Sequence, residues 1–224
     1  MTITKQTPLW NTTRKLTLAV LLAIQFTAAY AIGTSGLLMN SQSIMIPPIA
    51  LTVLIPVALF FTVYALSEHF RNFVLAQDIR TLTRLQHWRV VGFVFLVLYA
   101  FHQLPALFAI PAGLGDVAIG LSAAFVFSNM EKDPDYIFSN GFRRFHLLGL
   151  LDFTVALGTA ALSSGAFPAL ISNGLTSSAL DVWPLNLFPS FIVPCFIILQ
   201  LSALLKVRHL RQQHLATAGL VTVS

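Results

Sequence analysis

Long apolar stretches alternate with short polar stretches along the chain. Six apolar spans stand out, at residues 16–34, 44–66, 90–110, 111–128, 145–162 and 183–205. A bilayer core of about 30 Å needs about 20 residues of α-helix, and most of these spans have that length. The pattern therefore predicts an all-α integral membrane protein built as a single bundle of six transmembrane helices.

The basic residues lie only in alternate gaps between these spans. All 13 Lys and Arg residues fall before the first span, between the second and third, between the fourth and fifth, or after the sixth. Short loops rich in Lys and Arg stay in the cytoplasm. We therefore expect both termini inside, with 1–15 and 206–224 as cytoplasmic segments. This is the arrangement of a multi-pass protein of a plasma membrane, most simply a bacterial inner membrane.

Composition supports the membrane class and narrows the partners. Apolar residues make up 56% of the 224 residues and charged residues only 9%, which is too little charge for a soluble surface. The net charge of +5 comes from small groups that flank the spans, so we expect lipid head groups and no nucleic acid as partners. The single cysteine, Cys195, excludes a disulfide within the chain.

Two segments leave alternatives open. The basic start, the first apolar span and the small residues around Ala29–Ala31 resemble a cleaved signal peptide, although the apolar run continues past that point and is long enough to span. Cleavage would leave five helices. Residues 68–88 combine apolar and basic positions, which fits either an amphipathic helix in the inner interface or a cytoplasmic extension of the third helix.

The connection at 163–182 is also ambiguous. It is polar and carries one charge, but residues 166–171 are apolar, so it is either a re-entrant segment or a long external turn. Pro105 precedes Asp116 much as Pro168 precedes Asp181, with short matches beside each. The last two hairpins are therefore either a parallel repeat or a chance match.

Three ionisable residues lie away from the ends of the predicted spans, where a charge is costly and normally faces a bundle interior or a cavity. His102 lies about 18 Å from the inner boundary of the third span, and Asp116 about 9 Å from the outer boundary of the fourth. These two residues are thus expected to share an outer layer. Asp152 lies about 10 Å from the inner side and is expected in a different layer. A proton-exchanging His–Asp pair and a hydrogen-bonded neutral His102 are both consistent with the sequence.

Small residues near the two aspartates indicate faces where helices approach closely. Gly113 and Gly120 flank Asp116, and Gly149 and Ala156 flank Asp152. The run from Pro111 to Asp116 holds Gly113 and Gly115, which predicts unwound backbone beside the polar site, with Gln103 as a further polar neighbour. No Lys or Arg remains within the predicted spans. The aspartates should therefore be protonated, hydrogen-bonded or exposed to a water-filled cavity.

The remaining polar residues predict less chemistry. Asp181 precedes Trp183 and Pro184, so we expect it to cap the last helix at the outer surface. The six histidines match no compact metal motif, and we expect neither a metal nor a cofactor. Pro184, Pro189 and Pro194 should bend or break the last helix.

These observations favour a protein that transports or senses a small solute or a proton. The expected site consists of His102 and Asp116 in the outer half, Asp152 as an inner relay, and Gln103, Gly113 and Gly115 around them. No catalytic motif stands in the chain, so an enzymatic role is not expected. A membrane enzyme acting on a quinone or lipid, and an accessory subunit whose polar residues only lock helix packing, are the alternatives. Protein partners are not indicated.

Overall fold

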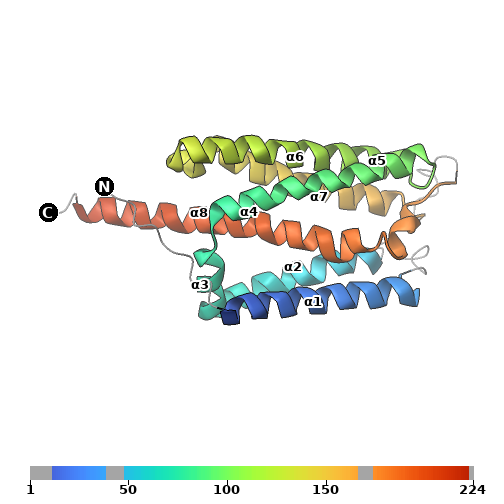
Figure 1. Ribbon diagram of the computed structural model, residues 1–224, viewed down its shortest axis with the longest axis horizontal. Helices are drawn as coiled ribbons and strands as arrows, with labels where there is room; N and C mark the ends of the chain where they lie inside the picture. Colours follow the sequence, from blue (N-terminus) through green and yellow to red (C-terminus); the bar gives the residue numbers. More distant parts are fainter. Residues whose placement is uncertain (1–11, 39–47, 166–173, 222–224) are drawn as a thin grey trace.

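A computed structural model describes residues 12–38, 48–165 and 174–221, and its regular elements in these ranges are all helical. Long helices run side by side along the molecule (Figure 1). The elements are α1 (Thr12–Ser35), α2 (Pro48–Leu66), α3 (Glu68–Ala76), α4 (Ile79–Leu85), η2 (Gln86–Gly92), α5 (Phe93–Ala100), α6 (Ala106–Lys132), η3 (Pro134–Phe138), α7 (Asn140–Leu162), η5 (Ser177–Asp181), η6 (Phe188–Ile192) and α8 (Val193–Val221). Five described helices are long and apolar enough to cross a membrane: α1, α2, α6, α7 and the run of η6 into α8.

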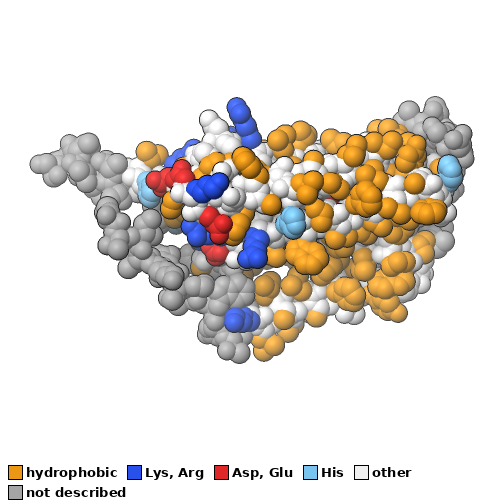
Figure 2. Space-filling view, turned by 45° about the horizontal axis from the view of Figure 1, so that its top comes forward, with side chains coloured by type: hydrophobic (Ala, Val, Ile, Leu, Met, Phe, Trp, Pro, Cys, Tyr) orange, Lys and Arg blue, Asp and Glu red, His pale blue; other side chains and the backbone are white. Residues whose placement is uncertain are grey.

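The distribution of side chains is that of a membrane-embedded protein. Large apolar residues such as Leu54 and Leu121 are exposed on the outer faces of the helices, whereas Gln86, His146 and Gln200 are buried inside. Figure 2 shows apolar side chains over most of the visible face, with Lys, Arg, Asp and Glu gathered toward one end. We call this end, which carries the η3 connection and the C-terminal part of α8, the basic end. Apolar atoms facing outward are stable in lipid and would be costly in water.

The segments α4, η2 and α5 follow one another as one helical rod. The residues at both junctions, Leu85 and Gly92, keep right-handed helical backbone angles, so the chain does not turn between the segments. A 3₁₀-helix has three residues per turn, so residues three apart align on one face. Thr83, Gln86, Arg89 and Gly92 are spaced in this way, and all four are buried.

The amphipathic segment predicted at 68–88 divides at Asp78. Helix α3 is capped by Ser67, whose side chain accepts a hydrogen bond from Phe70 N, and it lies across the direction of the long helices (Figure 1). Asp78 caps α4, where the side chain accepts from Arg80 N and Thr81 N. The first part is therefore a separate crosswise helix, and the part from Ile79 onward extends the rod.

The rod ends earlier than the predicted span at 90–110. Its last helical residue is Ala100, and His102 adopts a left-handed conformation with φ of 54°. His102 N donates to Tyr99 O and Gln103 N donates to Leu98 O, which is the hydrogen-bond pattern of a Schellman cap. The predicted boundary between the third and fourth spans, at residues 110 and 111, is therefore wrong. The turn lies at 101–105, and α6 begins at Ala106.

Helix α6 is continuous through the segment that was expected to unwind. Pro111 lies inside the helix, and the backbone remains helical past Gly113 and Gly115 to Lys132. Gly113 is buried against the Leu96 side chain of α5. Close packing against α5 and α7 thus outweighs the low helix propensity of glycine, which costs about 1 kcal/mol per residue.

The prolines of the last predicted span do break its helix. Residues 183–186 form turns, Pro189 lies in the π-helical turn η6, and α8 begins only at Val193. The preceding turn holds α1 to the bundle, because Asn186 Nδ2 donates to Ala29 O at 2.7 Å and Trp183 contacts the Tyr30 ring edge-on. The apolar residues 166–171 and the Pro168 part of the repeat fall largely outside the described residues.

Two apolar clusters occupy opposite ends of the bundle. Nearer the basic end lie Ile79, Leu82, Ile119, Ala123, Val126, Met130, Phe142, Phe145 and Ala203. At the opposite end lie Phe95, Leu104, Phe108, Ala109, Ala112 and Leu180. Along the rod, α6 and α7, the residues between the two clusters include Arg89, Asp116 and Asp152. The polar site therefore lies between two apolar layers.

Candidate functional site

A buried guanidinium joins the two aspartates singled out in the sequence. Arg89 is 1% exposed. Its Nε donates to Asp116 Oδ1 at 2.8 Å, and its Nη2 donates to Asp152 Oδ2. Its Nη1 donates to the carbonyl oxygen of Gly149 at 3.1 Å, and its Cζ lies 3.8 Å from the centroid of the Phe153 ring. We call Arg89, Asp116 and Asp152 the charged triad.

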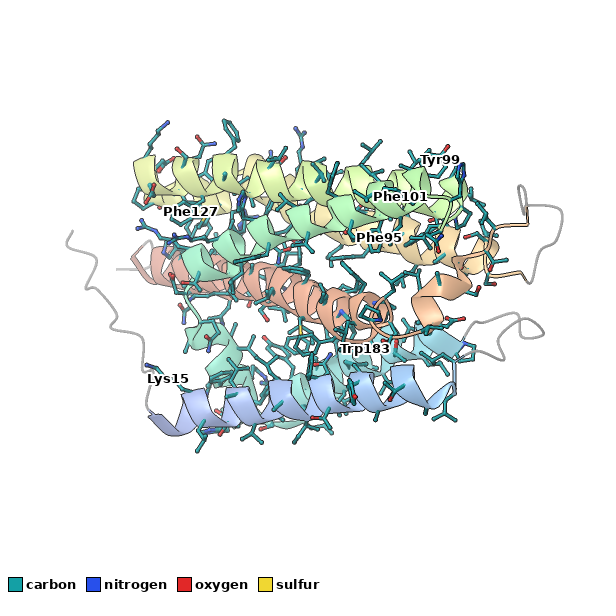
Figure 3. The ribbon with its side chains drawn as sticks, turned by 45° about the vertical axis from the view of Figure 1, so that its right-hand side comes forward. Lys15, Phe95, Tyr99, Phe101, Phe127 and Trp183 are labelled. Carbon is teal, nitrogen blue, oxygen red and sulfur yellow. The ribbon has the colours of Figure 1, made fainter. Side chains whose placement is uncertain are left out.

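Three different elements position the triad at mid-height. By helix rise, Arg89 lies about 15–18 Å from the start of α4, Asp116 about 15 Å from the start of α6, and Asp152 about 18 Å from the start of α7. Figure 3 shows Tyr99 and Phe101 at one end of the bundle, and Lys15 and Phe127 toward the other. The triad lies between these ends.

Glycines make room for the triad. A Cβ atom at Gly92 would meet the Asp116 side chain, one at Gly115 would meet Asp152, and one at Gly149 would meet Gln200 and Arg89. These glycines lie on the rod, α6 and α7, the three elements that carry the triad. Each element thus approaches a charged side chain of its neighbour where a larger residue would prevent the contact. The small-residue faces indicated by the sequence are these contact faces.

A second buried polar pair lies beside Arg89. The Gln200 side chain of α8 is within 2.6 Å of His146 Nδ1 of α7, and both residues are 0% exposed. With the amide oxygen toward Arg89, it accepts from Nη1 at 3.3 Å, and the amide nitrogen donates to His146 Nδ1. His146 Nε2 has no hydrogen-bond partner among the described residues. This pair extends the polar network from the triad toward the basic end.

A cavity reaches the triad from the opposite end of the bundle. Its volume is about 60 Å³, and α2, α5, α6, α7, η5 and the start of α8 all contribute to its wall. Asp116 lines it, and so do Ser164, Ser177 and Asp181. On α7 the lining runs from Phe153 to Ala161, which is about 12 Å by helix rise. The triad is therefore bordered by free space on one side and by the packed cluster of the basic end on the other.

The expected pairing of His102 with Asp116 is wrong. His102 and Gln103 are exposed in the turn after α5, and Gln103 Nε2 contacts only the nearby carbonyl of Phe101 at 3.4 Å. Asp116 lies a further ten residues into α6, about 15 Å away along the helix axis. The predicted third span, 90–110, runs through the turn at 101–105 and therefore placed His102 inside the bilayer.

The expectation of two separate acidic layers is also wrong, because both acids contact Arg89. Helix α6 begins four residues before the predicted Ile110 boundary and α7 begins five residues before Phe145, so both acids lie deeper than predicted. They meet at one guanidinium. Arg89 was assigned to a cytoplasmic gap, but α4 starts ten residues before it.

The other predicted site residues lie at different distances from the triad. Gly115 faces Asp152, whereas Gly113 packs against Leu96. Asp181 is the last residue of η5 and is 4% exposed, so it is not a surface residue at the start of the last helix. It lines the cavity instead. Among the described residues, no three His, Cys, Asp or Glu side chains gather as metal ligands would.

Arg89, Gln200 and His146 were missed as site residues, although a pattern in the sequence points to the first. The spacing Thr83, Gln86, Arg89, Gly92 places polar or small residues three apart directly before an apolar run. Such a stripe on a predicted membrane helix indicates a face turned away from lipid. Gln200 lies in the last predicted span, where a polar residue carries the same signal.

The charges of the triad do not cancel. With both carboxylates ionised, one guanidinium faces two negative charges, and the sum is −1. An uncompensated charge in a low-dielectric interior is costly. One proton or one monovalent cation would neutralise the triad. Asp116, which lines the cavity, is the carboxylate that such a ligand can reach.

The architecture defines an all-α membrane-embedded protein with a charged triad in its interior. The chain belongs to the family described as a domain of unknown function (DUF8737), whose model matches residues 46–208. The match covers the triad, the Gln200–His146 pair and the cavity lining, and it leaves out α1. No curated protein and no solved structure matches the chain.

Proposed function

We propose that the chain crosses a bacterial inner membrane six times, with both termini in the cytoplasm. The α4–η2–α5 rod would be the third span, and its 22 residues extend over about 36 Å, enough for a bilayer core of about 30 Å. The gathering of Lys and Arg toward one end supports this orientation (Figure 2).

Within this bundle, we propose that the charged triad binds a proton or a small cationic solute and that the protein transports or senses it. Asp116 receives the ligand from the cavity. Arg89 bonds to both Asp116 and Asp152, so the added positive charge acts on all three side chains. His102 has no part in this site. The observation that carries the proposal is a buried guanidinium bonded to two carboxylates at mid-height, with a cavity reaching one of them.

The two sides of the triad support a direction for access. The cavity leads toward η5 and the α5–α6 turn, whereas Phe142, Phe145 and Met130 are packed between the triad and the basic end. The ligand therefore arrives from the end opposite the basic one. Passage to the other side requires the packed cluster to open, and the Gln200–His146 pair supplies the next polar groups in that direction.

Proton uptake into vesicles tests the proposal. The purified chain is reconstituted with a trapped pH-sensitive dye, and a potassium gradient with valinomycin drives protons inward. We expect uptake above that of empty vesicles, and we expect Asp116→Asn and Asp152→Asn each to abolish it. His102→Asn is the matched control, because asparagine tolerates the left-handed conformation of this exposed residue. Uptake that survives both aspartate substitutions would contradict the proposal.

A purely structural role for the triad is the second candidate. It is favoured by the full set of Arg89 partners and by the glycines packed against the acids. In that case the protein is an accessory subunit, and Asp116→Asn would lower stability without any change in proton movement. The vesicle assay and a thermal unfolding curve of the same variants separate the two roles.

A further inference from the structure

The wall of the cavity is selective in charge. Asp116 and Asp181 line it, and no Lys, Arg or His is among its lining residues. Arg89 lies behind Asp116, where it is held by its own partners and is 1% exposed. A ligand in the cavity therefore meets carboxylates and no free cation. This arrangement repels an anion and stabilises a cation.

Most of the remaining wall is apolar and aromatic. Phe95 and Phe108 contact each other edge-to-face with centroids 5.2 Å apart, and both line the cavity together with Phe153. Alanine and leucine side chains of α7 complete the wall along its length. Aromatic faces attract organic cations, and apolar walls accept alkyl groups that water would exclude. An inorganic ion that keeps its hydration shell would gain little from such a wall.

The volume limits the size of the ligand. An enclosed water needs about 10–15 Å³ of cavity volume, so a cavity of about 60 Å³ holds on the order of four to six groups of that size. The lining on α7 extends from Phe153 to Ala161, about 12 Å along the helix axis. A short unbranched chain fits this elongated space better than a branched one.

We propose that the cavity binds a small primary alkylammonium ion, with the ammonium group at the Asp116 carboxylate and the alkyl chain along the Phe and Ala wall. The inference rests on the proposed function and names the solute class for the same site. The ammonium group supplies the one positive charge that the triad lacks. Asp181 lies in the wall of the same cavity and adds a second carboxylate to it.

Binding to the purified full-length chain in micelles tests this inference. The probe is n-butylammonium, titrated by calorimetry, and n-butanol is the neutral ligand of the same shape. We expect saturable binding of n-butylammonium and binding of n-butanol about 10- to 100-fold weaker, the ratio expected for a charged hydrogen bond. Equal binding of the alcohol would overturn the proposal, and so would the absence of binding.

Variants locate the site without touching the triad. Ala160→Leu places a larger side chain in the cavity wall and should abolish binding. Asp181→Asn should weaken it. Val155→Leu, on the exposed face of the same helix, is the matched control and should bind like the parent. Unchanged binding by Ala160→Leu would place the ligand elsewhere and overturn the proposal.

Proton uptake, measured without any amine, keeps the two proposals distinct. If n-butylammonium fails to bind while uptake still depends on Asp116 and Asp152, the solute class is wrong and the proton site stands. If n-butylammonium binds in the cavity while the aspartate substitutions leave uptake unchanged, the proton site is wrong.

Discussion

Arg89 is the residue on which the polar interior depends. Its guanidinium reaches two carboxylates and a backbone carbonyl and stacks on Phe153, so every edge and one face have a partner. Buried ion pairs of this kind are often no more stable than apolar residues of the same volume, but removal of one partner leaves an unpaired buried charge. The energetic consequence of a substitution therefore depends on what happens to the whole triad.

This dependence predicts non-additive stability. Arg89→Leu alone should lower the free energy of unfolding by about 3–5 kcal/mol, because two carboxylates lose their cation. The triple variant Arg89→Leu, Asp116→Asn, Asp152→Asn should recover most of that loss. Denaturant unfolding in micelles measures the stability of the single and the triple variant. Arg89→Lys tests whether one ammonium group can replace the planar guanidinium, which bonds to both carboxylates. If Arg89→Leu alone were as stable as the parent, the two aspartates would not need Arg89.

At this scale the sequence predicted the two acids and missed their partner. Asp116 and Asp152 were expected in the interior because small residues flank them, and the structure buries most of each side chain (14% and 12% exposed). Arg89 was assigned to the cytoplasmic gap before the third span, because the rule for basic residues assumes correct span boundaries. His102 shows the same error in reverse, since a Schellman cap is set by backbone geometry that hydropathy does not report.

At the scale of elements, close approach of helices creates the site. Gly92, Gly115 and Gly149 let the rod, α6 and α7 come near enough for one guanidinium to contact both acids. The 3₁₀ geometry of η2 aligns Gln86, Arg89 and Gly92 on one buried face. Apolar periodicity alone predicted neither the rod's 3₁₀ segment nor its early end, because both are set by backbone hydrogen bonds that hydropathy does not report.

Two glycines of α7 provide a matched test of this packing. Gly149→Ala should lower the free energy of unfolding by about 1–3 kcal/mol, because the added methyl group meets Gln200 and Arg89. Gly158→Ala has open space within 4 Å and should be neutral or stabilising by up to about 1 kcal/mol. Thermal unfolding of the two variants beside the parent provides the comparison. Equal effects would mean that the contact at Gly149 is looser than described.

At the scale of the molecule, the fold places polar groups inside and apolar groups outside. The sequence predicted this all-helical, membrane-embedded architecture from the spacing of its apolar spans. Helix α1 is a partial exception to the tight packing. It is attached through Asn186 and the Tyr30–Trp183 contact, and it lies outside residues 46–208, which the family model matches. The part of the chain that the family model matches therefore includes the triad and the cavity.

The six-span topology predicts which residues face the same side of the membrane. The native cysteine is first removed by Cys195→Ser. One cysteine at a time is then introduced at an exposed position, Asn72, Gln103 or Glu131. Each variant is labelled with an impermeant maleimide in oriented vesicles. We expect Asn72 and Glu131 to react from the cytoplasmic side and Gln103 from the other side. Reaction of Asn72 and Gln103 from the same side would mean that the α4–η2–α5 rod does not cross the membrane.

The central claim is that one proton neutralises the triad when no cation is bound, and infrared spectroscopy tests it most directly. At pH 7 exposed aspartates are ionised, so a carboxylic-acid C=O band reports a buried protonated side chain. We predict such a band in the reconstituted parent and in Asp135→Asn, which removes an exposed loop acid, and its loss in Asp116→Asn or Asp152→Asn. A parent protein without the band, or a band that persists in both aspartate variants, would contradict the account.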